Sequence, residues 1–159
     1  GGLVADFVRG DASPLDYAKS IDGSAYAGFH LIVGDHDLFH VANSGVLGMI
    51  EGVFAISNAP PGTEWEKTAV AREFVRSAAK FHSSADELAS DLLQFLSTPR
   101  GAGSAIEREV FVASAQYGTR SSTVIICDAF GNLLFVEQNY GAGGVRDGAP
   151  LRYRLPFMT

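Results

Sequence analysis

Two helical segments with apolar residues on one side only constrain the fold of this chain most. Val70, Phe74 and Phe81 recur at helical spacing in the first segment, and Leu88 and Leu92 do so in the second. One-sided helices must bury their apolar faces against something flat, most simply a sheet. Because strand-like segments precede and follow this helical hairpin, we predict an α+β fold with helices stacked on an antiparallel sheet. The length of 159 residues suits a single domain, residues 1–159.

The remaining elements are predicted from turn residues and short apolar runs. Ser13 before Pro14 is typical of a helix start, and capping boxes at 63–66 and 84–87 predict the starts of the two long helices. Two shorter helices are expected at 3–8 and 14–20. The predicted strands are 29–33, 38–42, 46–50, 53–56, 110–113, 123–128, 133–138 and 151–155, with loops at 98–104 and 141–148.

Charge and cysteine content exclude several classes of function. The formal net charge is −6 and the sequence pI is about 5.1, so we expect no basic surface for a nucleic-acid backbone. No apolar run reaches membrane-spanning length, and no stretch has the pattern of a signal peptide. The single cysteine, Cys127, excludes an internal disulfide and suits a reducing compartment. We therefore predict a cytoplasmic protein with no nucleic-acid partner and no membrane span.

Arg120 is the first candidate site residue. It follows Tyr117-Gly118-Thr119 and stands at the mouth of an apolar segment that is predicted to be a buried strand. A guanidinium is costly to bury without a partner, so folds usually place it there to meet an anion or a polarised carbonyl. The alternative is an ordinary ion pair at the edge of a sheet.

Asn58 is the second candidate. It ends a predicted strand and is followed by Pro60 and Pro61, which stiffen the chain. An asparagine at such a position can donate its carboxamide N–H to a substrate carbonyl or a developing oxyanion. The alternative is that Asn58 merely starts a turn, which asparagine does readily.

The remaining polar and aromatic candidates are weaker. A two-residue hairpin loop would place His30 and His40 on opposite faces of their strands, whereas a three-residue loop would place them on one face. Ligation of a metal or haem by His30, His36 and His40 depends on that register, and we predict no metal site. Cys127 is expected to be a buried structural thiol, and Trp65 is expected in the core.

Four sequence elements, in this order, resemble the NRDE family, also called the transport and Golgi organisation protein 2 family, and they span nearly the whole chain. They are Tyr26-Ala27-Gly28-Phe29-His30-Leu31-Ile32, Ile56-Ser57-Asn58-Ala59 with Trp65 following, Tyr117-Gly118-Thr119-Arg120-Ser121-Ser122, and Asp128-Ala129-Phe130-Gly131-Asn132.

The resemblance implies an N-terminal-nucleophile hydrolase-like αββα sandwich, in which two antiparallel sheets lie between helical layers. Family members begin with Met-Cys, which an Asn-Arg-Asp-Glu motif follows, and this sequence has neither segment. We therefore expect the fold to be incomplete at the N-terminus, because the chain is a fragment, a processed form or a truncated one. Its sheets would then expose unpaired edges through which copies can self-associate.

The resemblance also implies roles for site residues. By similarity to choloylglycine hydrolases and penicillin acylases of the same fold, Asn58 would help hold the substrate carbonyl or oxyanion. Arg120 would set the electrostatics around the nucleophilic thiolate, so both residues are predicted to be catalytic. Tyr117, Thr119 and Ser121 are predicted to bind substrate, and no cofactor is expected.

Two functions are consistent with these residues. The first is an N-terminal-nucleophile-type hydrolase that acts on a small amide or acyl substrate, with the nucleophile absent from the chain as given. The second, which the family resemblance implies, is a non-catalytic binding or trafficking protein for haem or an acyl-lipid anion, in which Arg120 pairs with a carboxylate or phosphate. The sequence alone does not separate them.

Overall fold

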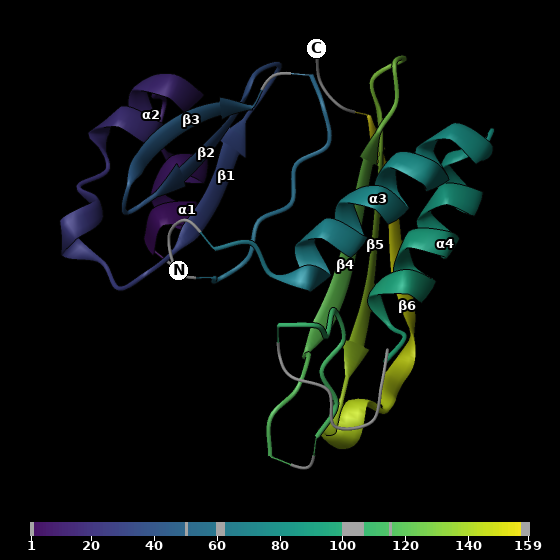
Figure 1. Ribbon diagram of the computed structural model, residues 1–159. Coiled ribbons are helices and arrows are strands. Elements are labelled where there is room, and N and C mark those ends of the chain that lie inside the picture. The colour runs from purple at the N-terminus through teal and green to yellow at the C-terminus, as the bar shows by residue number, and fades with distance from the viewer. Residues whose placement is uncertain (1, 50, 60–62, 100–106, 115, 157–159) are drawn as a thin grey trace. The chain divides into compact units, whose positions relative to one another are not determined.

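The computed structural model describes residues 2–49, 51–59, 63–99, 107–114 and 116–156 (Figure 1). The chain divides into two compact units, Gly1–Pro60 and Pro61–Thr159. Each unit contains helices and a three-stranded antiparallel sheet, which confirms the predicted α+β class. The single domain over residues 1–159 stays a prediction.

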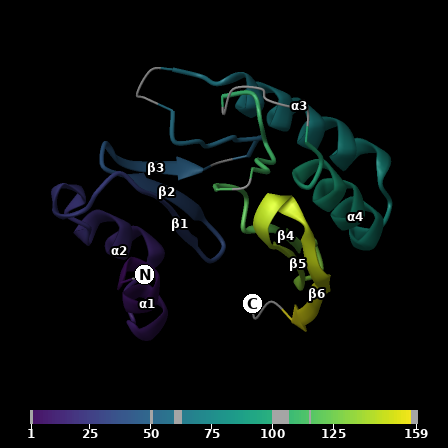
Figure 2. The same cartoon turned by 90° about the horizontal axis from the view of Figure 1, so that it is seen from below.

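The first unit is a three-stranded sheet with two short helices on one face (Figures 1 and 2). Ala18, Val33 and Val41 form its buried core, and Ser13 caps the second helix by accepting a hydrogen bond from the N–H of Asp16, as predicted. The elements are α1 (Gly2–Arg9), α2 (Pro14–Ser20), a 3₁₀ turn at Gly23–Ala25, β1 (His30–Gly34), β2 (Leu38–Ala42) and β3 (Gly45–Met49).

Asn43, in the turn between β2 and β3, fixes the segment that enters β1. Its side-chain oxygen accepts a hydrogen bond from the N–H of Phe29 at 3.1 Å. Its amide nitrogen donates to the carbonyls of Gly23 at 2.7 Å and Tyr26 at 3.2 Å. Because one amide satisfies three backbone groups of an irregular segment, residues 26–29 have a defined path without belonging to a helix or strand.

The predicted strand at 53–56 is wrong. Residues 51–59 form neither helix nor strand, and Phe54 and Ile56 are exposed. Apolar composition favours a strand only where a neighbouring backbone offers hydrogen bonds, and this segment pairs with none of the described strands.

The second unit begins with the helical hairpin, α3 (Glu66–Phe81) and α4 (Ala85–Leu96). The helices pack together partly through the rings of Phe74 and Phe95, whose centroids are 4.1 Å apart. Ser84 caps α4 by accepting from the N–H of Glu87, as predicted.

The predicted capping box at 63–66 is wrong. The residue before the first helical residue is Trp65, and its side chain makes no capping hydrogen bond. Trp65 is half-buried at this helix start rather than in the core, with the ammonium of Lys67 4.5 Å from its ring centroid. The helix begins two residues later than a cap at Thr63 requires.

The sheet of the second unit consists of β4 (Ser121–Cys127), β5 (Asn132–Tyr140) and β6 (Arg146–Pro156), in that spatial order. The predicted strand at 110–113 is wrong, since this segment makes only an isolated bridge between Ala113 and Gly118. The predicted loop at 141–148 is shorter than expected, because a 3₁₀ turn at Ala142–Gly144 leads directly into β6. Most of the predicted loop at 98–104 lies outside the described residues.

One face of this sheet packs against α4, and the other face is open within the unit. Figure 2 shows α4 over this sheet. Ala89 and Leu93 of α4 form the core with Val124, Leu134 and Val136 of the strands, whereas Leu92 of the predicted helical face packs against this core only partly buried. The register aligns Ile125, Phe135 and Tyr153 across the open face, where Ile125 is 59% and Tyr153 is 53% exposed. Cys127 also lies on the open face and is exposed.

The prediction that Cys127 is buried is therefore wrong. Side chains alternate between the two faces of a strand, so the residues at 122, 124 and 126 face α4 while Cys127 faces away. Among the described residues, no helix is long and apolar enough to cross a membrane.

Candidate functional site

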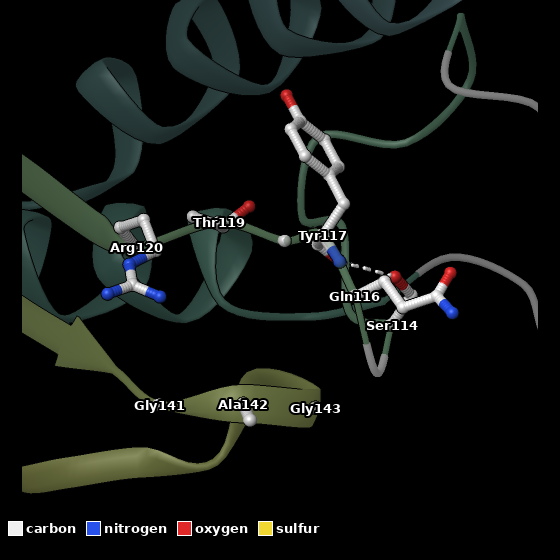
Figure 3. Close-up of a pocket in the computed structure, with 9 residues that line it drawn as sticks. Ser114, Gln116, Tyr117, Thr119, Arg120, Gly141, Ala142 and Gly143 are labelled. Carbon is white, nitrogen blue, oxygen red and sulfur yellow. Dashed lines mark hydrogen bonds between the residues drawn. The ribbon is translucent and has the colours of Figure 1, made fainter.

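A small hollow lies where the chain enters β4, and all of its lining residues belong to the second unit (Figure 3). Its volume is about 80 Å³. Two segments line it, one formed by residues 114 and 116–120 and the other by residues 141–143. Arg120 contributes the only charged side chain among these lining residues.

A tight turn builds the first wall. The N–H of Ser114 donates to the carbonyl of Tyr117 at 3.0 Å, and the N–H of Tyr117 donates to the hydroxyl of Ser114 at 3.0 Å. A Cβ atom at Gly118 would lie 2.9 Å from the carbonyl oxygen of Val112, so only glycine lets the two backbones approach this closely. The Tyr-Gly-Thr-Arg element thus needs its glycine for packing.

Thr119 anchors this wall to the preceding segment. Its hydroxyl accepts a hydrogen bond from the N–H of Val112 at 3.0 Å, and its own N–H donates to the carbonyl of Val112 at 2.8 Å. These bonds satisfy the backbone of a segment that has no regular strand partner.

The glycine-rich turn after β5 forms the second wall. The N–H of Tyr140 donates to the carbonyl of Arg120 at 2.9 Å, and the N–H of Gly143 donates to the carbonyl of Ser114 at 3.3 Å. Gly143 and Gly144 adopt left-handed conformations, with φ of 69° and 74°. Each wall is therefore held to the other by backbone hydrogen bonds, which do not depend on a ligand.

The guanidinium of Arg120 is exposed at this hollow. Figure 3 shows it on the side of residues 141–143, whereas the ring of Tyr117 points the opposite way. Arg72, Arg76, Arg108, Arg152 and Arg154 each pair with a carboxylate. Within the described part of the chain, the side chain of Arg120 makes no ion pair and no hydrogen bond. Arg120 therefore lies at the mouth of β4, where it was predicted, and is exposed there.

The structure brings three of the predicted site residues together. Arg120, Tyr117 and Thr119 line the hollow, and the side chain of Tyr117 is largely exposed. Ser121 does not line it, since this residue already belongs to β4 and pairs with Asn139. The next residue, Ser122, is buried and donates its hydroxyl hydrogen to the carbonyl of Leu96.

Asn58 lies in the other unit. It is exposed at a bend within the irregular segment 51–59, so the expected strand end is absent. No hydrogen bond of its side chain is present among the described residues. A joint role of Asn58 and Arg120 stays a prediction.

Sequence reasoning missed part of the hollow. Ser114 and Gln116 were not singled out, and residues 141–143 were interpreted as a flexible connector. The consecutive glycines at 143 and 144 were the available signal, because adjacent glycines can form a turn with positive φ.

Comparison with known proteins confirms the family that the four sequence elements resemble. The sequence model of the family described as "Transport and Golgi organisation 2" matches residues 1–142. The chain belongs to this family.

Three mammalian relatives are similar over most of the chain. The chain is 31% identical to the transport and Golgi organization protein 2 homolog of Bos taurus. It is 27% identical to the Mus musculus homolog and 28% identical to the Homo sapiens homolog. Each alignment covers 87% of this chain and 61% of the relative, so the chain spans less than two thirds of these proteins.

Proposed function

We propose that the hollow at Arg120 binds the anionic group of a small organic ligand. The observation that carries the proposal is an exposed guanidinium that has no carboxylate partner among the described residues and faces a hollow between two fixed walls. A guanidinium pairs strongly with carboxylate and phosphate because its N–H groups match the spacing of two oxygen atoms.

The size of the hollow limits what it can hold. Pockets that enclose whole drug-sized ligands have volumes of roughly 300–1,000 Å³. The hollow at Arg120 has a volume of about 80 Å³, which suits a carboxylate or phosphate group and not the body of a larger ligand. We therefore propose a binding or trafficking function for an anion whose apolar body lies outside the hollow, such as haem or an acyl-lipid.

Hydrolysis of a small amide or acyl substrate is a less supported proposal for the whole protein. The hydroxyl of Ser114 donates to the carbonyl of Tyr117, and Thr119 accepts from the backbone, so neither is poised as a nucleophile. Cys127 ends the strand that begins after Arg120 and, at about 3.3 Å per residue, lies about 23 Å away along it. Catalysis would need a nucleophile from another segment, with Asn58 and Arg120 as supporting residues.

The αββα sandwich also remains a proposal. Each unit has a sheet with helices on one face only, which is what the architecture requires of each half. The open apolar face of the second unit supports the idea that another layer covers it.

Arg120→Ala tests the binding proposal in the intact chain, by titration with haem and with palmitoyl-CoA. We expect the variant to bind the ligand about tenfold more weakly. This is the low end of the range of about 1.5–3 kcal/mol for charge-assisted hydrogen bonds, because the guanidinium is exposed. Arg120→Lys keeps the positive charge and should lose less affinity for the ligand than Arg120→Ala.

Arg76→Ala is the matched control, since Arg76 is also exposed and lies on α3, where it pairs with Glu73. It should leave the affinity unchanged at equal ionic strength. Equal losses in Arg120→Ala and Arg76→Ala would mean that the ligand senses overall charge and would contradict the proposal. Absence of binding by the unmodified chain would contradict it as well.

A further inference from the structure

Two histidines of the first unit, His30 and His40, lie in direct contact and are not part of the hollow at Arg120. The Nδ1 atom of His30 and the Nε2 atom of His40 are 2.9 Å apart. Their ring centroids are 5.1 Å apart, with an angle of 26° between the ring planes. The two facing nitrogens share one proton in the neutral pair, and the tautomers decide which nitrogen carries it.

The strand register explains why the rings meet. A three-residue loop, residues 35–37, joins β1 and β2, so the alternative in which both histidines share a face is the one that occurs. His40 pairs with Ile32 and His30 pairs with Ala42, which makes the histidines diagonal neighbours on that face. This face is opposite the one that carries Val33 and Val41, which pack with α2.

Apolar side chains flank the pair. In the register, Ile32 and Leu47 lie on either side of His40, and both are exposed. His40 itself is partly buried.

The distance between the nitrogens is close to that of two imidazoles on one metal ion. Two metal–nitrogen bonds of about 2.0–2.1 Å that meet at about 90–110° place the nitrogens about 2.9–3.4 Å apart. We infer that His30 and His40 form a two-histidine site for a divalent transition-metal ion, with Cu²⁺ the best-fitting ion.

Binding of the metal ion requires one of the two imidazoles to change its tautomer. When the metal binds, the proton between the rings moves through solvent to the outward nitrogen of the ring that carried it, and both facing nitrogens present lone pairs. Cu²⁺ binds imidazole most tightly of the common divalent ions and accepts nitrogen ligands at about 90°. In the part of the chain that the structure describes, no third histidine, cysteine, aspartate or glutamate completes the set, so water occupies the other positions.

Titration of the intact chain with Cu²⁺ in a non-coordinating buffer, followed by electron paramagnetic resonance, tests the inference. We expect one equivalent to bind with a two-nitrogen signature. His30→Gln and His40→Gln should each weaken binding at least about tenfold, since each removes half of the ligands. His36→Gln, in the hairpin loop, and His82→Gln, in the pair with Asp91, should leave binding unchanged.

A second measurement uses the unmodified chain, so it does not depend on whether the variants fold. Substoichiometric Cu²⁺ should broaden the imidazole resonances of His30 and His40 in the unmodified chain before those of His36 and His82. Uniform broadening of all four histidines, or a loss of affinity in His36→Gln or His82→Gln as large as in His40→Gln, would overturn the inference. So would absence of binding by the unmodified chain.

Discussion

At the scale of single residues, two adjacent glycines hold the second wall of the Arg120 hollow. Gly143 and Gly144 have φ values of 69° and 74°. A Cβ at Gly144 would lie 2.7 Å from the Cβ of Ala113 and 2.9 Å from Cε1 of Phe111, which is buried, whereas nothing lies within 4 Å of a Cβ at Gly143. Both positions have a left-handed backbone conformation, but only at Gly144 would a Cβ clash with neighbouring side chains.

We predict that Gly143→Ala lowers the free energy of unfolding by about 1–2 kcal/mol, the usual cost of a left-handed conformation for a residue with a Cβ. Gly144→Ala should cost about 1–3 kcal/mol more, because the methyl group must displace Phe111. Urea denaturation of both variants measures the difference. Equal losses would show that crowding at Gly144 is relieved without cost.

The site shows what residue types alone can indicate. Arg120, Tyr117 and Thr119 of the Tyr-Gly-Thr-Arg element line one hollow, and their roles in catalysis or binding stay predictions. The positions of Ser114 and of residues 141–143 in the hollow could not be predicted, because they depend on backbone hydrogen bonds between segments far apart in sequence. The exposure of Arg120 could not be predicted either, since the exposure of a side chain at a strand entrance depends on what covers it.

At the scale of elements, one carboxylate links the start of α4 to the edge strand β6. Asp86 lies in the first turn of α4, and its Oδ1 is 2.7 Å from Nη1 of Arg152, while its other oxygen pairs with Arg154. The two arginines alternate with Leu151, Tyr153 and Leu155, so they lie on the face that packs against α4. The interaction spans more than sixty residues of sequence.

We predict that Asp86→Asn lowers the free energy of unfolding by about 0.4–2 kcal/mol, the sum of two partly exposed ion pairs at about 0.2–1 kcal/mol each. The loss should shrink at high salt, because screening weakens the pairs that are removed. Thermal denaturation at low and high ionic strength is the measurement.

Glu87→Gln is the control for this substitution. Glu87 lies in the same first turn, so both variants lose the same favourable interaction with the helix dipole. A salt-sensitive loss as large in Glu87→Gln as in Asp86→Asn would attribute the effect to the dipole and not to the arginines.

Element prediction succeeded where the signal was local and failed where it was not. Ser84 caps α4 because its hydroxyl reaches an N–H three residues away, which the sequence encodes directly. The segments at 53–56 and 110–113 have strand composition but lack a complete neighbouring strand among the described residues. A strand is defined by its pairing partner, and composition cannot supply one.

At the scale of the whole molecule, the open face of the sheet in the second unit is an apolar surface that the described helices of that unit leave uncovered. Ile125, Tyr153, Leu155 and Leu151 are each close to half exposed or more, and all lie on strands of one sheet. Contiguous apolar surface of this kind usually marks an interface. A sandwich requires such a face to be covered.

We predict that Ile125→Lys lowers the free energy of unfolding of the intact chain by more than about 2 kcal/mol, because a covered face would bury the new charge. Phe130→Lys is the control, since Phe130 is 90% exposed in the β4–β5 turn and should change stability by less than about 0.5 kcal/mol. Chemical denaturation compares the two. If Ile125→Lys is as harmless as Phe130→Lys, the face is open and the sandwich proposal fails.

Local sequence was sufficient to predict the helices, most of the strands and the family of this protein. Helical periodicity, the Ser84 cap and the ordered motifs depend on residues close together in the chain, so their chemistry can be read without the fold. Tertiary structure decided the pairing of β1 with β2 that brings His30 next to His40, the exposure of Cys127 and the position of the two walls of the hollow at Arg120. These depend on strand register and backbone pairing between distant segments, where a shift of one residue moves every side chain to the other face.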